Sequence, residues 1–244
     1  RRKNKMDEII LCKYGEIVLK GLNKKQFETV MLKQIRHRIE PFGRFSVTSA
    51  QSIAYIKPES CEGDFEEDAD IESAFNAVRK VFGIVTVAKA AVTEKNMDAV
   101  FSAVTEYILP ELRRREYKTF KVEGKRGDKT FALTSPEISS ETGALILKNA
   151  PWLRVNVKNP DVVVRVEIRA VNAYVYIDSV KGAGGLPVGS GGRGLLLLSG
   201  GIDSPVAGWM MAKRGVAVDA LHFESFPYTS ERAREKVFEL ARIM

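Results

Sequence analysis

Residues 199–204 have the composition of a phosphate-binding loop, since they read Ser-Gly-Gly-Ile-Asp-Ser and directly precede Pro205. Glycines allow backbone N–H groups to approach an oxyanion closely, and the dipole of a following helix favours its negative charge. The hydroxyl groups of Ser199 and Ser204 add two donors. The carboxylate of Asp203 repels phosphate, so we expect it to cap the helix or to orient a Mg²⁺ ion that bridges phosphates. This segment therefore predicts a nucleotide site.

The segment differs from two common nucleotide-binding motifs. It lacks the G-x-x-x-x-G-K-[ST] pattern, whose lysine contacts the β- and γ-phosphates. It also lacks the G-x-G-x-x-G pattern of dinucleotide sites. The alternative interpretation is a structural turn in which Asp203 is only a helix cap. All six residues together, placed between a strand and a helix, favour phosphate binding over that alternative.

The elements around the loop are predicted to form a strand, a helix and a second strand. The four leucines at 195–198 predict a fully buried strand of a parallel sheet. Pro205 is expected at the first position of a helix that has a Ser or Asp N-cap and ends near 213–215. Residues 216–223 predict the next strand, joined to the first by a right-handed crossover.

The net charge of +7, from 38 Lys+Arg against 31 Asp+Glu, is unevenly distributed. Residues 1–38 contain 11 bases and 4 acids, residues 111–131 contain 8 and 4, and residues 195–244 contain 6 and 6. For any one cluster a solvated helix face is the better interpretation. Two basic clusters upstream of a nucleotide loop, however, favour a polyanion such as nucleic acid. The candidate RNA-binding residues are Arg113, Lys118, Lys121, Lys125, Arg126 and Lys129.

Upstream of the loop, helices and strands alternate. Hydrophobic periodicity and capping residues predict helices at 23–39, 71–80, 98–115 and 135–149. Strands are predicted at 8–13, 44–49, 52–57, 84–92, 119–123, 161–170 and 174–178, with a polar loop at 124–128 and a tight turn at 172–173. The chain is expected to divide into two α+β domains, 1–66 and 67–180, a linker at 181–194, and an α/β unit at 195–244. Seven glycines in fourteen residues predict a flexible linker.

Composition excludes several classes of protein. With 45% hydrophobic and 28% charged residues the chain is globular, and no apolar run approaches the roughly 20 residues of a membrane span. Cys12 and Cys61 are too few for a disulfide framework, so we expect reduced thiols and a cytoplasmic protein. No cluster of His and Cys residues predicts a metal site.

The loop resembles that of the PP-loop ATP pyrophosphatases, and a longer match is similar to the tRNA 4-thiouridine synthetases of the ThiI family. The matching segments are Gly185-Leu186-Pro187-Val188-Gly189, Leu197 to Gly208, Tyr14-Gly15-Glu16, Leu19-Lys20-Gly21, Val81-Phe82-Gly83-Ile84, and Phe120-Lys121-Val122 with Lys125-Arg126. The resemblance implies a ferredoxin-like domain, a THUMP RNA-binding domain, and the beginning of a PP-loop domain with a parallel sheet.

The resemblance also implies an activity. ThiI-family members activate uridine 8 of tRNA with ATP and Mg²⁺, and then insert sulfur from a persulfide that a cysteine desulfurase supplies. Many also provide sulfur for the thiazole of thiamine. The implied ATP-binding residues are Leu197, Leu198, Ser199, Gly200, Gly201, Asp203, Ser204, His222 and Phe223. Asp203 is the implied catalytic residue, and His222 with Phe223 would meet the adenine unless they form only a buried strand end.

The sequence departs from the family pattern in one respect. A PP-loop domain needs further strands after residue 223, and the chain stops at Met244. The resemblance implies that the family's sulfur-carrying cysteine and a later catalytic lysine lie beyond it. Neither Cys12 nor Cys61 is a good substitute, because reactive thiolates prefer electropositive surroundings. We therefore expect a fragment, and the first alternative is an inactive tRNA-binding module.

Two other classes of enzyme are considered. A PP-loop ligase for a small molecule would use ATP without tRNA, and the basic N-terminal segments argue against it. A THUMP-containing methyltransferase is disfavoured because no methyl-donor glycine motif follows the linker. The partners expected are the acceptor region of tRNA and the cysteine desulfurase. A thiamine sulfur-carrier protein and a homodimer remain open.

Overall fold

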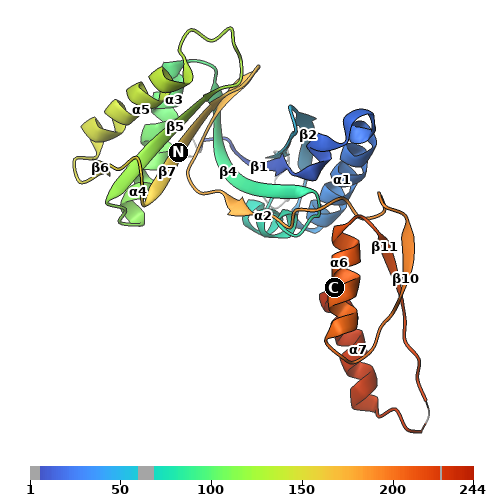
Figure 1. Cartoon of the computed structure of the whole chain (residues 1–244). Coiled ribbons are helices and arrows are strands. Elements are labelled where there is room, and N and C mark those ends of the chain that lie inside the picture. Colours follow the sequence, from blue (N-terminus) through green and yellow to red (C-terminus); the bar gives the residue numbers. More distant parts are fainter. Residues whose placement is uncertain (1–5, 60–68, 226) are drawn as a thin grey trace, which may run out of the picture.

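The structure, a computed structural model, describes residues 6–59, 69–225 and 227–244. Figure 1 shows two α/β halves that share one curved sheet and a C-terminal unit that projects from the first half. Cys61 and the acid-rich residues 62–68 lie outside the described residues. Among the helices that are described, none has the length and apolar character needed to cross a membrane.

The first half has a ferredoxin-like arrangement. Its elements are β1 (Glu8–Tyr14), α1 (Lys24–Ile39), β2 (Phe45–Ala50), β3 (Ile53–Pro58), α2 (Ile71–Val78) and β4 (Ile84–Glu94). The strands are antiparallel in the order β2-β3-β1-β4. Both helices cover one face of the sheet, where Met31, Ile35 and Val78 are fully buried among the alternate residues of β1 and β4. The inward-facing periodicity of α1 predicted from the sequence is confirmed.

The second half continues the same sheet. Its elements are α3 (Met97–Ala103), a π-helical segment (Val104–Ile108), α4 (Leu109–Arg114), β5 (Thr119–Arg126), α5 (Ser135–Asn149), β6 (Arg154–Val155), β7 (Val162–Ile168), β8 (Asn172–Tyr176) and β9 (Val180–Lys181). The order continues from β4 through β8, β7 and β5 to β6, and β9 pairs with β4. Only β4 therefore joins the two halves by strand pairing among the described residues, and Figure 1 shows it passing from one half to the other.

Capping residues explain where several helices begin. The side chain of Asp70 accepts a hydrogen bond from the N–H of Ser73, and Asn96 does the same for Ala99. Thr134 and Glu137 form a reciprocal capping box at the start of α5. Residues 98–115, predicted as one helix, form a continuous run with a π-helical segment before Pro110. Since proline lacks an N–H and crowds the preceding turn, a local widening of the helix is expected there.

The C-terminal unit consists of β10 (Arg193–Leu197), α6 (Asp203–Lys213), β11 (Ala217–Leu221) and α7 (Glu231–Ile243). β10 and β11 are parallel neighbours, as the predicted crossover requires. Arg214 forms a 2.8 Å ion pair with Glu16, and the ring of Trp209 contacts Phe82 edge-on at 5.6 Å. These contacts hold α6 against the first half.

Three local predictions near the loop are wrong. Leu195 and Leu197 are 64% and 58% exposed, because β10 has only β11 as a neighbour in the described chain. Pro205 is the third residue of α6 rather than the first, and the N-cap position of this helix makes no side-chain hydrogen bond. The glycine-rich segment is no free linker, since Gly83 donates to the carbonyl of Gly184 and Leu186 donates to that of Lys213.

Two predictions in the second half also need correction. Residues 124–126 of the predicted polar loop belong to β5, where they pair with β7. The predicted turn at 172–173 is the start of β8. In both places the neighbouring strand extends the ladder beyond what local residue preferences indicate.

Candidate functional site

The loop at residues 199–204 is closed by its two serines. The hydroxyl of Ser204 accepts a hydrogen bond from the N–H of Ser199 at 2.9 Å, and the two hydroxyl oxygens lie 3.1 Å apart. The N–H of Gly201 also donates to the Ser199 hydroxyl, at 3.3 Å. These bonds fold the loop back on the start of α6, whose first N–H groups have no partner within the helix.

Packing does not explain the two glycines of this loop. A Cβ atom placed on Gly200 would have no neighbour closer than 3.9 Å, and one on Gly201 would lie 3.4 Å from the Ser199 hydroxyl. Neither residue has a positive φ angle. Their bare backbone therefore leaves room for a ligand next to the N–H groups, which fits the phosphates of a nucleotide.

The remaining predicted nucleotide residues lie at the same end of the sheet. The N–H of Leu198 donates to the carbonyl of Leu221, and the carbonyl of Leu198 lies 2.9 Å from Nδ1 of His222. Nδ1 must donate in this pair, and Nε2 is buried without a partner among the described residues. The carboxyl ends of neighbouring parallel strands commonly bind ligands. Phe223 follows His222 at this strand end and is exposed, and so is the side chain of Leu197.

Asp203 is the first residue of α6 and is exposed. A carboxylate in the first turn interacts favourably with the helix dipole. No group of three or more His, Cys, Asp or Glu side chains gathers into a metal site in the described chain. A magnesium ion at this position would therefore be bound by Asp203 together with oxygens of the nucleotide itself.

Lys236 is a residue near the loop that sequence reasoning missed. Its Cδ atom lies 3.9 Å from a Cβ built on Gly200, because α7 packs across the loop. The capping side chain of Ser230 fixes the start of that helix. The loop itself has no lysine, and Lys236 is a cation that a different helix brings next to it.

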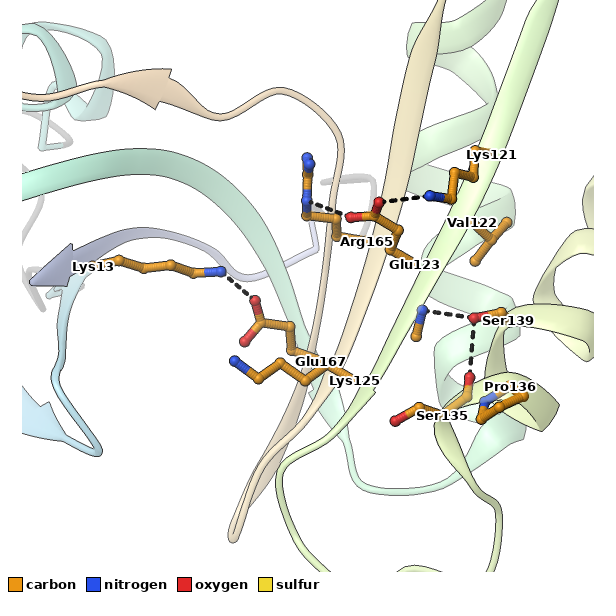
Figure 2. Close-up of a pocket in the computed structure, with 11 residues that line it drawn as sticks. Lys13, Lys121, Val122, Glu123, Lys125, Ser135, Pro136, Ser139, Arg165 and Glu167 are labelled. Carbon is orange, nitrogen blue, oxygen red and sulfur yellow. Dashed lines mark hydrogen bonds and ion pairs between the residues drawn. The ribbon is translucent and has the colours of Figure 1, made fainter. Parts of the chain in front are cut away.

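A second concave surface runs along β5 and reaches the first turns of α5, and Figure 2 shows its side chains. The cavity has a volume of about 520 Å³ and is lined by Lys13, Lys121, Lys125, Arg165, Glu123, Glu167, Ser135, Ser139 and their neighbours. Four cations thus face two carboxylates. Lys121 and Arg165 both pair with Glu123, at 3.1 and 3.4 Å, and hold that carboxylate between them.

The structure brings together only part of the predicted RNA-binding set. Lys121 and Lys125 alternate with the buried side of β5 and line the cavity. Arg113 lies on α4, on the helix-covered side, where its guanidinium stacks over Trp152 at 5.3 Å. Lys118 and Lys129 are exposed outside the cavity lining, and the guanidinium of Arg126 donates to the carbonyl of Phe131. Lys13 and Arg165 were not predicted, because the sequence does not show that β7 pairs with β5 or that a side chain of β1 reaches the same cavity.

Glu167 is the most buried charge of this surface, at 3% exposure. Burial alone would raise its pKa. Hydrogen bonds from Lys13 and Tyr176, with the charges of Lys13 and Arg169, outweigh burial and lower the pKa to about 2. The carboxylate therefore stays ionised at neutral pH inside the fold.

Acid is expected to destabilise the protein through Glu167. Since its folded pKa lies below the unfolded value, its stabilisation is complete above about pH 4.5 and is lost as the pH falls toward about 2. At about 1.4 kcal/mol per pH unit, the contribution near neutral pH is about 3 kcal/mol. Urea unfolding at about pH 6 and about pH 3 measures it. The wild type should lose more stability over this interval than Glu167→Gln, and equal losses would contradict the assignment.

Three family models match the chain in succession. They are the ThiI ferredoxin-like domain over residues 9–88, the THUMP domain over residues 94–178, and the thiamine biosynthesis protein ThiI over residues 189–244. The chain belongs to the ThiI family. The ThiI matches confirm the predicted fold class, a ferredoxin-like and a THUMP domain followed by the beginning of a PP-loop domain.

ThiI-family relatives are similar along nearly the whole chain. Probable tRNA sulfurtransferases of Acetivibrio thermocellus and Coxiella burnetii are 46% and 42% identical to it over 239 and 243 residues. Each match covers 98% of this chain and 59% of the relative, so the chain spans little more than half the length of these curated relatives.

Two solved structures share the fold. A crystal structure of a 4-thiouridine synthetase in complex with RNA and bound ATP superposes with a TM-score of 0.82 at 38% identity, covering 97% of this chain and 58% of that one. A crystal structure of a Pyrococcus horikoshii Ot3 protein gives 0.83 at 27% identity, covering 97% and 73%. Both superpositions cover the two halves of the sheet and the C-terminal unit of this chain.

Proposed function

We propose that this chain is part of an ATP-dependent tRNA sulfurtransferase that makes 4-thiouridine at position 8 of tRNA. The observation that supports it best is the presence of two separate sites, a glycine loop open to phosphates and a cationic cavity on the THUMP half. Relatives named as probable tRNA sulfurtransferases, and a neighbour crystallised with RNA and ATP, support the same assignment.

The nucleotide loop has a defined part in this reaction. The N–H groups of residues 199–204 and the start of α6 would hold the phosphates, with Lys236 supplying a cation. Asp203 would hold a Mg²⁺ ion, and that ion would supply positive charge to the phosphates. The uracil carbonyl oxygen would attack the α-phosphorus of ATP, and pyrophosphate would leave. Positioning and charge stabilisation provide most of the catalysis in such displacements. The unpartnered Nε2 of His222, beside Leu198, lies at the strand end expected for the adenine.

The sulfur chemistry is assigned to another part of the full-length protein. Cys12 is fully buried in β1, and burial raises the pKa of its thiol far above the usual range, so it is unsuited to bind persulfide sulfur. We propose a cysteine desulfurase as the donor, the cytoplasm as the location, and sulfur transfer for the thiamine thiazole as a second role. The domain boundaries near residues 180 and 194 also remain proposals.

Removing the two cavity lysines of β5 is expected to weaken tRNA binding. Lys121→Gln with Lys125→Gln should lower the affinity by about tenfold near physiological salt, and should reduce the slope of log affinity against log salt by about 1 to 2. Filter binding of unmodified tRNA over a series of salt concentrations measures both. Arg113→Gln is the matched control, because that cation lies on the opposite side of the sheet. Equal losses in control and double variant would refute the assignment of the cavity.

The alternative function is tRNA binding without thiolation. It is the function proposed for these 244 residues when they are separated from the rest of the protein. Their matches cover 59% of the curated relatives. Thiolation of tRNA by the full-length protein, compared with tRNA binding by residues 1–244, distinguishes the two functions. Binding by the shorter chain with thiolation only by the full-length protein would assign the RNA site to this half of the molecule.

A further inference from the structure

A buried polar network joins the two halves of the sheet on the helix-free face. Nζ of Lys13 in β1 lies 2.5 Å from Oε1 of Glu167 in β7 and 2.9 Å from the hydroxyl of Tyr176 in β8. That hydroxyl donates to the same carboxylate oxygen at 2.6 Å. Figure 2 shows the Lys13 side chain reaching across from the first half toward Glu167. Residues more than 150 positions apart in sequence are thereby fixed to one another.

A second connection runs from Arg169 back to the first half. The guanidinium of Arg169 pairs with the other carboxylate oxygen of Glu167 and donates to the side-chain oxygen of Gln51 at 3.0 Å. Arg169 is only 8% exposed. Gln51 lies in the turn between β2 and β3, at the tip of the first half. The network therefore contacts the first half at two places, one strand and one turn.

The turn that bears Gln51 has an unusual backbone. Gln51 and Ser52 have φ angles of +50° and +63°, a conformation that favours glycine, asparagine or aspartate. Hydrogen bonds from Lys24 to the Ser52 hydroxyl at 2.8 Å and from the N–H of Tyr14 to its carbonyl at 3.1 Å hold the turn in place. Strained backbone of this kind persists where the surroundings require it. Here it directs the Gln51 side chain to Arg169.

The network is energetically sensitive to the angle between the halves. Glu167 and Arg169 are buried and the Lys13 side chain is 30% exposed, and a buried charge that loses its partner is strongly destabilising. A buried apolar cluster that includes Ile9, Leu11 and Tyr174 also joins the halves. The network adds charged contacts whose distances depend on the angle between the halves. On the helix-covered face, the hydroxyl of Tyr107 bonds to Glu8 and braces the same junction.

We propose that Lys13, Gln51, Glu167, Arg169 and Tyr176 form a latch that fixes the ferredoxin-like half against the THUMP half, so that both halves contact one tRNA in a single register. These are positioning residues, and the inference rests on the proposed function. The latch forms the floor of the cationic cavity, since Lys13 and Glu167 line it. Bending at the junction would separate Lys13 from the cations of β5.

The test uses variants of the full-length protein that change the latch without changing the lysines of β5. Glycine suits the backbone of residue 51, so Gln51→Gly removes the partner of Arg169 in the first half while relieving strain and leaving its pair with Glu167. We expect unmodified tRNA to bind about fivefold more weakly, with KM for tRNA raised and kcat nearly unchanged. Unchanged affinity for tRNA, together with a higher midpoint of thermal unfolding, would overturn the latch. The turn at residue 51 would then have no positioning role.

Two glutamate variants distinguish an effect on the positions of the halves from an effect on the charge of the cavity. Glu167→Gln and Glu123→Gln each remove one ion-paired carboxylate from the same cavity, but Glu123 contacts only residues of the THUMP half. Removing negative charge near a phosphate site favours RNA binding. Glu123→Gln should therefore bind tRNA as tightly as the wild type or more tightly, whereas Glu167→Gln should bind it about tenfold more weakly. Equal behaviour of the two variants would overturn the latch.

Measuring the distance between the two halves tests the latch in the absence of RNA. Spin labels at Lys33→Cys in α1 and Lys148→Cys in α5, both exposed, report the spacing of the halves by pulsed electron resonance. The background carries Cys61→Ser and serine at every exposed cysteine of the rest of the full-length protein. A narrow distribution that broadens in Gln51→Gly supports the latch, and an unchanged distribution overturns it. If the wild type binds no tRNA, the proposed function fails, and the distances still give the result for the latch.

Discussion

Replacing Asp203 with alanine is expected to abolish ATP-dependent activation of tRNA while leaving tRNA affinity nearly unchanged. Asp203 is exposed at the first turn of α6, next to the serine-closed loop, and makes no side-chain hydrogen bond within the described chain. Its contribution to folding is limited to the helix dipole, about 0.3–1 kcal/mol. A carboxylate that orients Mg²⁺ on the phosphates stabilises developing charge, and losing such a group costs about 100-fold or more in rate.

Release of AMP or pyrophosphate by the full-length protein in the presence of tRNA measures this loss, and filter binding measures tRNA affinity. Asp219→Ala is the matched control, since Asp219 is another exposed acid of the same unit, paired with Arg193 at 2.8 Å. The control should retain activity within about twofold. A parallel fall of tRNA affinity in Asp203→Ala would show that RNA and nucleotide sites are not separate, contrary to the proposed division of roles.

Replacing Gly185 with valine is expected to detach the C-terminal unit from the rest of the protein. Gly185 has a φ angle of +73°, and a Cβ atom there would lie 2.2 Å from the carbonyl oxygen of Lys213. The left-handed conformation costs roughly 1–2 kcal/mol for a non-glycine residue. The clash with backbone at the end of α6 adds to this cost, so we expect about 3 kcal/mol or more of destabilisation.

Limited proteolysis within residues 182–192 and loss of tRNA thiolation by the full-length protein measure the detachment. Gly184→Val is the matched control, because its φ angle is +65° but a Cβ there meets nothing within 4 Å. Gly184→Val should be destabilised only by the cost of a left-handed backbone at a non-glycine residue. If the two variants were cleaved at equal rates, backbone conformation alone would account for the glycines, and the close approach to α6 would be unimportant.

Much of the fold follows from local sequence. The spacing of Met31, Ile35 and Ile39 is sufficient to predict α1, because hydrophobic periodicity acts within a few turns. The side chain of Asn23, at the predicted start of this helix, makes no capping hydrogen bond. The strand–loop–helix order around residues 199–204 also follows from residue types alone. The predicted ThiI-family membership is confirmed through motifs of this local kind.

Residue types and their spacing predict most elements, the candidate nucleotide loop with its two serines, and a basic character that favours RNA. Which cations share a cavity depends on the fold, since Lys13, Lys121 and Arg165 come from three strands that sheet order brings near one another. The tertiary structure also decided that Arg113 lies on the other face, that α7 brings Lys236 to Gly200, and that Glu167 joins the two halves. The physical reason is that charge and hydrogen-bond partners depend on long-range register, which residue preferences do not encode.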